Sequence, residues 1–277
     1  MRRPPLAEYW PRPSVLGVVN VTPDSFSDGG ENVDPAVAVA TGRRLLAEGA
    51  ALVDIGGEST RPGADAVSLD EELRRVLPVL EGLAGAPVSI DTSKSEVARR
   101  ALLLGAALVN DVTALRGDPA LAGVIADAGA YVCLMHMQGE PRTMQVEPRY
   151  DDVVGDVIGF LEERLAMAVA AGIPEEHVCL DPGIGFGKTP AQNLELLRGL
   201  ARICSIGRPV LVGLSRKSTL ARVLGDPTAR VSSDAASVGA AVAAFDRGAT
   251  LFRAHDVAAH VDALAVAAAI ERGGVSS

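Results

Sequence analysis

Short apolar runs recur eight times along this chain of 277 residues, and nearly all of them stop at a polar residue. A run of four to six aliphatic residues is too short for a buried helix and is typical of a strand buried on both faces. The polar residues at or near the ends of these runs are Asn20, Glu58, Asp91, Asn110, Asp111, His136, Asp181, Lys217 and His255.

The spacing of the runs predicts the fold, because each gap between them holds enough chain for one amphipathic helix. Eight strand-then-helix units in one chain predict an α/β fold, a (β/α)8 TIM barrel with a single domain. Strands are expected at 14–21, 51–55, 88–91, 108–111, 131–135, 178–181, 209–213 and 251–253. In a barrel the carboxyl ends of the strands form one rim, so the polar residues should converge on one mouth.

Helices are expected at 34–49, 69–83, 93–104 and 151–171, and the last helix at Asp256. Asp34 and Pro35 suit the cap and first turn of a helix. Because no linker or shift of composition divides the sequence, residues 14–277 are expected to form one barrel. Residues 1–13 are expected to form a short flexible leader.

Composition narrows the class of protein. With 48% hydrophobic residues the chain can bury one large core, and a net charge of -9 argues against a nucleic-acid surface, which needs clustered positive charge. No stretch approaches the ~18 consecutive apolar residues of a membrane span. Three widely spaced cysteines without a C-x-x-C pair suggest free thiols in a reducing compartment, so we expect a cytoplasmic protein.

Two common site motifs are absent. The segment LDPGIGFGKT, residues 180–189, resembles a phosphate-binding loop, but the position of the first required glycine holds Pro182. His255 and His260 are five residues apart, which does not match the H-E-x-x-H zinc motif. The glycines of the segment are expected instead to let the backbone pass close to a flat ligand.

Several longer blocks resemble the successive motifs of the dihydropteroate synthase family. They are VNVTPDSFSDGG (19–30), DIGGESTRPGA (54–64), SIDTSK (89–94), VNDV (109–112), LMHMQG (134–139), LDPGIGFGK (180–188), GLSRKS (213–218) and RAHDV (253–257). The resemblance spans the chain after the leader and implies the barrel already predicted. It also implies a transferase of folate biosynthesis, which condenses (7,8-dihydropterin-6-yl)methyl diphosphate with 4-aminobenzoate and releases dihydropteroate and diphosphate. Ala254 departs mildly from the pattern, because a larger aliphatic residue is more usual there.

The resemblance implies three sets of site residues. The pterin, whose edge is rich in N–H donors, is bound by Asp91, Asn110, Asp181 and Lys217, of which Asp91, Asp181 and Lys217 are catalytic. The diphosphate is bound by Asn20, Arg61, Arg253 and His255, and Asn20 is also the ligand of Mg2+. The 4-aminobenzoate is bound by Thr60, Pro62, Phe26, Phe186 and Ser218, and sulfonamides should imitate it.

Plainer alternatives remain for some of these residues: Asp91 could cap the following helix, Asn20 could be structural, and Lys217 could be solvated.

For the reaction we expect diphosphate to leave before the amine attacks, with no covalent nucleophile. Since the pterin and diphosphate sets are distinct, loss of Arg253 is expected to weaken mainly the diphosphate substrate. Two other functions stay open, a methyltetrahydrofolate-type methyltransferase barrel and a non-catalytic pterin-binding paralogue.

The last two helices are unusually apolar for the outside of a barrel. Residues 235–245 read AASVGAAVAAF and residues 261–270 read VDALAVAAAI. A helix with apolar residues on its outer face needs a further partner. We therefore expect a homodimer packed through these two helices, with Ala241 and Ala267 at the contact and each active site within one chain.

Overall fold

The computed structural model describes residues 3–22, 34–60, 64–140, 143–226, 228 and 231–273. Phe26, Arg61 and Pro62, which the sequence assigns to the site, lie outside these ranges.

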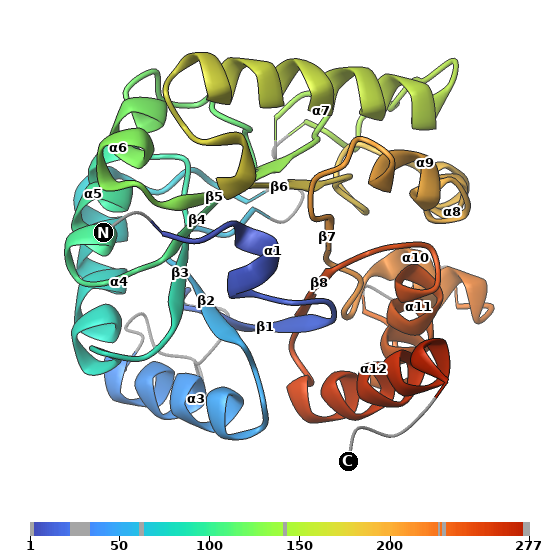
Figure 1. Cartoon of the computed structure of the whole chain (residues 1–277), viewed down its shortest axis with the longest axis horizontal. Helices are drawn as coiled ribbons and strands as arrows, with labels where there is room; N and C mark the ends of the chain where they lie inside the picture. Colours follow the sequence, from blue (N-terminus) through green and yellow to red (C-terminus); the bar gives the residue numbers. More distant parts are fainter. Residues whose placement is uncertain are drawn as a thin grey trace.

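Eight parallel strands form a closed barrel, which confirms the predicted fold class (Figure 1). They are β1 (Ser14–Asn20), β2 (Leu52–Gly56), β3 (Val88–Asp91), β4 (Leu108–Asp111), β5 (Tyr131–Met135), β6 (Val178–Asp181), β7 (Leu211–Val212) and β8 (Leu251–Ala254). Neighbours pair in the order β6-β5-β4-β3-β2-β1-β8-β7. A parallel bridge between Leu180 and Val210 closes the ring between β6 and β7. β7 is shorter than expected, and the other strands lie close to their predicted positions.

Helices surround the strands (Figure 1). They are α3 (Pro35–Ala47), α4 (Leu69–Gly82), α5 (Ser95–Leu103), α6 (Leu121–Ala128), α7 (Val153–Ala170), α8 (Pro190–Arg198), α9 (Leu200–Cys204), α10 (Ser218–Val223), α11 (Asp234–Phe245) and α12 (Val257–Arg272), with the short 3-10 helix η1 (Glu175–His177) before β6. Asp34 caps α3 as predicted, because its carboxylate accepts from Ala36 N at 2.8 Å. None of the described helices combines the length and the apolar character needed to cross a membrane.

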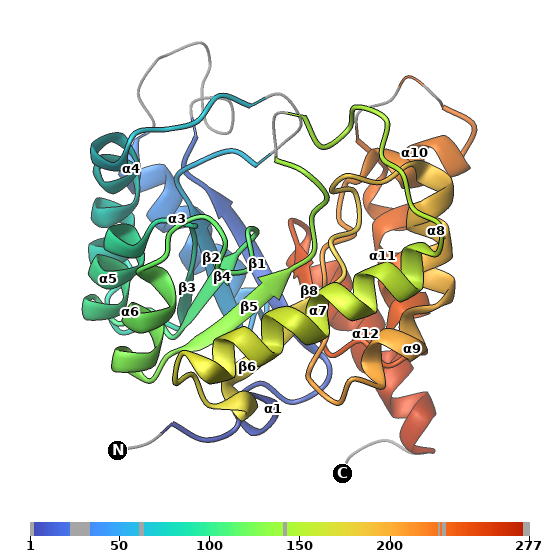
Figure 2. The same ribbon diagram turned by 90° about the horizontal axis from the view of Figure 1, so that it is seen from above.

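The amino-terminal segment is not the flexible leader that the sequence suggested. Residues 6–9 form α1 (Leu6–Tyr9), and Leu6 and Trp10 are buried among the side chains at one end of the barrel. Tyr131 donates from its hydroxyl to Pro4 O at 2.8 Å. Figure 2 shows α1 below the strands, whereas α10, which follows β7, lies near the upper end. The segment therefore closes the amino-terminal end of the barrel.

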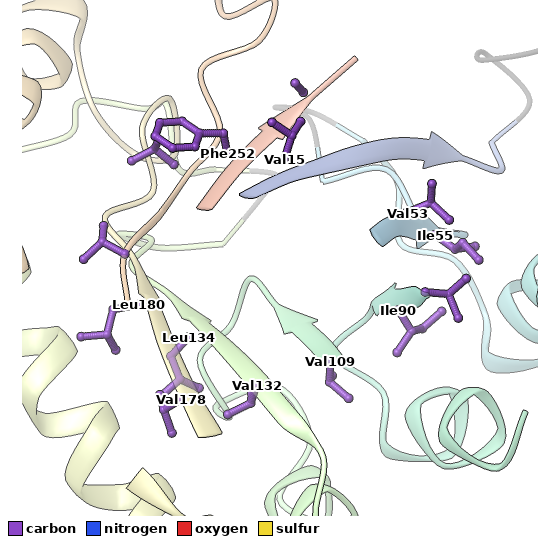
Figure 3. Packing of buried hydrophobic residues seen from close by; sticks show 14 of the residues in the cluster. Val15, Val53, Ile55, Ile90, Val109, Val132, Leu134, Val178, Leu180 and Phe252 are labelled. Carbon is purple, nitrogen blue, oxygen red and sulfur yellow. The ribbon is translucent and has the colours of Figure 1, made fainter. Parts of the chain in front are cut away.

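Side chains alternate between the inside and the outside of the barrel along each strand. Val53, Ile90 and Val132 belong to the cluster that packs against the helices (Figure 3). Leu52 and Tyr131, which precede Val53 and Val132, face the opposite way, and so does Leu108 of β4. These three side chains pack with Leu6 and Trp10 inside the barrel. This alternation decides which polar residues reach the interior at the other end.

Candidate active site

Polar side chains fill the barrel interior near the carboxyl ends of the strands. Counting by twos from the interior residues Leu16, Leu52 and Leu108 reaches the interior positions of Asn20, Asp54 and Asn110. The same alternation places Asp91, Asp181 and Arg253 inside, since Val88, Val178 and Phe252 belong to the outer cluster. The predicted convergence at one mouth is therefore correct for these strands.

Asp54 joins three of these strands. This fully buried carboxylate accepts from Ser89 Oγ at 2.7 Å, from Asn110 Nδ2 at 3.1 Å and from Arg253 Nε at 2.7 Å. Because Asn110 uses its amide N–H2 on Asp54, its amide oxygen is oriented as an acceptor for other groups. Asp54 thus fixes the side chains of Asn110 and Arg253 from within the barrel.

Asp91 lies above Asp54 and is buried. Its Oδ2 accepts from Arg253 Nη2 at 3.0 Å, and burial raises the pKa of this carboxyl to about 7 although Arg253 acts in the opposite direction. The alternative role as a helix cap does not hold, because the residue at the amino-terminal boundary of α5 is Lys94. Asp91 is an interior carboxylate beside a guanidinium.

Asp181 ends β6 and faces the glycine-rich loop that follows. Burial raises the pKa of its carboxyl to about 6, and Gly183 N donates to its Oδ1 at 2.7 Å. Gly183 has φ of +67°, and a Cβ there would lie 1.8 Å from His136 O. The loop can therefore press against the end of β5 only with glycine at this position. That the glycines also let the backbone pass close to a flat ligand stays a prediction.

Lys217 and Phe186 meet across this loop. Lys217 Nζ lies 4.3 Å from the centre of the Phe186 ring, and a Cβ on Gly185 would come within 3.2 Å of Lys217 Cδ. Lys217 is half-buried, so it is not the solvated lysine of the plainer alternative. An ammonium over an aromatic face, next to a buried carboxylate, can orient a flat polar ring.

The remaining described site residues lie around the same rim. Asn20 ends β1 and is half-buried, and Ser218 is the first residue of α10. His255 follows β8, and its Nδ1 lies 3.0 Å from Ser215 Oγ, which also accepts from His255 N at 3.2 Å. His255 Nδ1 and Ser215 Oγ share one hydrogen bond, and the tautomer of the ring decides which of the two atoms donates.

A cavity of about 360 Å³ opens beside Asp91. Thr60 lines it from the loop after β2, and Val112 and Met137 line it from the loops after β4 and β5. It gives a small molecule access to the interior carboxylate of Asp91 and brings Thr60 to the site.

Two polar residues at the ends of apolar runs do not point into the barrel. Asp111 accepts from Thr113 N at 2.8 Å and from Leu115 N at 2.6 Å, and so shapes its own loop. The ring of His136 contacts Phe160 of α7 edge to face, with 4.8 Å between ring centres. Asp111 is the last residue of β4, and His136 follows β5 directly. Along both strands the alternation of side chains places these positions on the outside of the barrel, toward the helices.

Sequence reasoning missed Asp54 and Ser215 as supports of the site. Asp54 had a usable signal, since it lies two positions after the interior residue Leu52 and within a motif block. Ser215 also lies within a motif block, but its contact with His255 spans 40 residues, which no local pattern indicates.

Comparison with known proteins shows the family of this chain. A family model described as pterin binding enzyme matches residues 16–255. A dihydropteroate synthase of Neisseria meningitidis serogroup C is 47% identical over 260 residues, with 91% of each chain covered. The structure of Xanthomonas albilineans dihydropteroate synthase with 4-aminobenzoic acid superposes with a TM-score of 0.86 at 52% identity, covering 94% of both chains. That of the Yersinia pestis enzyme in a sulfonamide drug complex gives 0.87 at 45% identity, covering 94% of this chain and 95% of that one.

The fold and the interior polar site define a barrel of the pterin-binding enzymes. Within that class, the chain belongs to the dihydropteroate synthase family, a family of transferases. The resemblance to this family in the motif blocks is confirmed, because the similar proteins just named are dihydropteroate synthases and not methyltransferases.

Proposed function

We propose that this chain makes 7,8-dihydropteroate from (7,8-dihydropterin-6-yl)methyl diphosphate and 4-aminobenzoate, with diphosphate leaving before the amine attacks. The observation that carries the proposal is the pair of buried carboxylates, Asp91 and Asp181, whose pKa values are raised to about 7 and about 6 by burial. Buried anions of this kind are poised to accept N–H groups and to stabilise positive charge.

The pterin edge is bound by interior residues. Asp181 and the amide oxygen of Asn110 accept its N–H donors, and Lys217 donates to its acceptor edge. The loop around Gly183 and Gly185 packs closely beside this edge. This arrangement orients the methylene carbon of the substrate toward the rim of the barrel.

Bond breaking is helped by charges on both sides of the methylene carbon. The C–O bond breaks and its electron pair leaves with diphosphate, and the resulting cation is delocalised into the dihydropterin. Asp91 and Asp181 stabilise this cation, while Arg253 and His255 stabilise the departing anion. The amine nitrogen of 4-aminobenzoate then forms the new C–N bond and loses its proton to solvent.

Asn20 is the residue proposed to hold Mg2+. Asn20 lies at the interior end of β1, and the described residues contain no group of three or more His, Cys, Asp or Glu able to hold a metal. One protein oxygen therefore fits an ion whose other ligands are phosphate oxygens and water. Bound there, Mg2+ would offset the charge of diphosphate. With Asn20→Ala, calorimetry should show weaker diphosphate binding only when Mg2+ is present.

For 4-aminobenzoate, Phe186, Thr60 and Ser218 are the described residues assigned to binding. Phe186 packs against a small cluster that includes Met135 and Met137, so its ring can offer one face to a second flat molecule. A sulfonamide should then compete with 4-aminobenzoate in steady-state kinetics. Purely noncompetitive inhibition would contradict this pocket.

The decisive experiment is an assay of diphosphate release with the dihydropterin diphosphate, 4-aminobenzoate and Mg2+, each omitted in turn. Dihydropteroate, identified by mass, should form only when the organic substrates are both present. A folded protein that binds pterin but forms no product at micromolar concentration would instead be the non-catalytic paralogue.

The chain is further proposed to form a homodimer through α11 and α12. Val266 and Ile270, one turn apart on α12, are 61% and 75% exposed. Ala235, Gly239 and Ala243 form a small exposed stripe on α11. Exposed aliphatic residues beside small ones allow a second helix pair to approach closely. Ala241 does not belong to this surface, since it is only 2% exposed within the subunit.

A cytoplasmic location is also proposed. Cys133 and Cys179 are buried free thiols, which a reducing compartment preserves.

A further inference from the structure

Lys188 is a buried lysine to which the proposed reaction gives no role. Its side chain is 2% exposed, although lysine is rarely buried to this extent. Its Nζ donates to Phe186 O at 2.9 Å and to Gly183 O at 3.0 Å, and lies 2.9 Å from His136 Nδ1. These nearest partners are carbonyl oxygens and an imidazole nitrogen, so the ammonium serves as a three-way donor.

The imidazole is an acceptor in this arrangement. Burial lowers the pKa of His136 to about 3, so its ring is neutral at physiological pH. With Nδ1 accepting from Lys188, the ring proton lies on Nε2. Burial also lowers the pKa of Lys188 to about 7. Such a buried amine needs a specific role to offset its loss of hydration.

The two carbonyls nearest to Lys188 belong to peptides next to pterin-site groups, and a third, His136 O, is 3.5 Å from Nζ. The Gly183 residue donates from its N–H to Asp181 Oδ1 and accepts at its carbonyl from Lys188, so it links the two side chains directly. Phe186 carries the ring that lies 4.3 Å from Lys217 Nζ. Lys188 therefore contacts both the residue that donates to Asp181, which is Gly183, and the residue whose ring lies against Lys217, which is Phe186.

The opposite side of the loop is held independently. Gly185 N donates to Asn193 Oδ1 at 2.8 Å, and Tyr150 donates from its hydroxyl to Gly187 O at 2.8 Å. If Lys188 were lost, the loop would remain attached at Gly185 and Gly187, while the peptides of Gly183 and Phe186 would lose their common donor. The expected consequence is a displaced site rather than an unfolded loop.

We infer that Lys188 is a positioning residue of the pterin subsite, which sets the Asp181 carboxylate and the Phe186 ring through the carbonyls of Gly183 and Phe186. This inference rests on the proposed function, since it concerns the same site. It assigns Lys188 no contact with substrate.

Binding measurements on Lys188→Met test the inference, because methionine fills similar volume without a donor. Calorimetry should show at least a tenfold loss of affinity for 6-hydroxymethylpterin, a pterin without diphosphate. Affinity for inorganic diphosphate with Mg2+ should change less than twofold, because Arg253 and His255 lie on other strands. Equal losses for both ligands, or pterin affinity within twofold of the parent protein, would overturn the inference.

Two further variants complete the test. Tyr131→Phe removes a partly buried hydrogen bond to a carbonyl at the opposite end of the barrel and should lower stability without changing pterin affinity. Lys188→Gln retains two donors, so its pterin affinity should fall between those of the parent protein and Lys188→Met. If Lys188→Met does not fold, a Lys188→Gln protein that loses affinity equally for the pterin and for inorganic diphosphate contradicts the inference. Failure of the parent protein to make dihydropteroate would instead concern the proposed function.

Discussion

Arg253 Nη2 donates to Asp91 Oδ2 at 3.0 Å, so a residue assigned to diphosphate is in direct contact with one assigned to pterin. The sequence led us to expect that these two sets act separately. The contact changes that expectation, because a nearby guanidinium favours the charged form of a carboxyl. The two subsites share Arg253 and Asp91.

The first prediction follows from this contact. Arg253→Met should raise the pKa of Asp91 further, since Arg253 now lowers it against the effect of burial. At pH 7 the affinity for a diphosphate-free pterin should fall about tenfold, which corresponds to about 1.4 kcal/mol, and it should recover toward pH 9. Calorimetry across this pH range checks the prediction. Arg99→Met, which breaks an exposed pair with Glu96, is the control and should leave pterin affinity unchanged.

The second prediction concerns Asp181 and stability. Burial raises its pKa from 3.8 to about 6, so the folded protein binds a proton more tightly than the unfolded chain does. This group favours the folded state fully below pH 3.8, and that contribution is lost as pH rises through about 6. Asp181→Asn should therefore be more stable than the parent protein above pH 6, by about 2 to 3 kcal/mol, and should bind pterin poorly.

Denaturant unfolding at several pH values measures this difference. The advantage of Asp181→Asn should grow between pH 4 and pH 6 and stay constant above pH 7. An advantage that does not vary with pH would mean that the carboxyl is not destabilised by burial.

The third prediction concerns the close approach of Gly183 to β5. In Gly183→Ala the new methyl group would collide with His136 O, and φ of +67° is unfavourable for alanine. We expect a loss of about 3 kcal/mol or more in unfolding free energy, together with loss of pterin binding. Gly159→Ala is the matched control, because nothing lies within 4 Å of its Cβ position in α7. That change should stabilise the protein by about 0.5 to 1 kcal/mol.

The fourth prediction concerns the amino-terminal segment. Leu6 is fully buried at the end of the barrel, so Leu6→Ala should lower the unfolding free energy by about 2 to 5 kcal/mol. Leu103, which is 78% exposed on α5, provides the control, and Leu103→Ala should change stability little. Equal effects of the two substitutions in thermal unfolding would mean that residues 3–13 do not contribute to the core.

The fifth prediction concerns the dimer. Val266→Glu combined with Ile270→Glu should convert the protein to a monomer in sedimentation velocity at micromolar concentration, because two charges would be buried at the proposed contact. Both side chains are exposed within the subunit, so folding should be preserved. Leu103→Glu adds a charge to a different face and should leave the dimer intact. A parent protein that sediments as a monomer would exclude the proposed assembly.

The order of elements and the positions of most strands could be predicted from the sequence. Eight short aliphatic runs require burial on both faces, and a parallel barrel with outer helices provides that for all of them. Asp91, Asn110 and Asp181 could also be predicted, because each ends such a run and matches a motif block. These features are local, since they depend on the residue types within one strand and its flanks.

The pattern of apolar runs by itself did not distinguish Asp91 from Asp111, because each of them ends such a run. The alternation of side chains along each strand directs Asp91 into the barrel and Asp111 away from it, toward its own loop. Which positions face the interior can be assigned only once one interior residue of each strand is known. Nor did it reveal the burial of Leu6 and Trp10, because a segment of a few residues has no periodicity to interpret.

Contacts across the closed ring were decided by tertiary structure alone. Arg253 meets Asp54 across 199 residues and Asp91 across 162 residues of sequence. Only closure of β8 on β1 brings this guanidinium above the interior of β2 and β3. The sequence by itself determined which chemical groups each strand end presents. Closure of the barrel determined which of these groups interact electrostatically, because this interaction depends on distance and burial rather than on order along the chain.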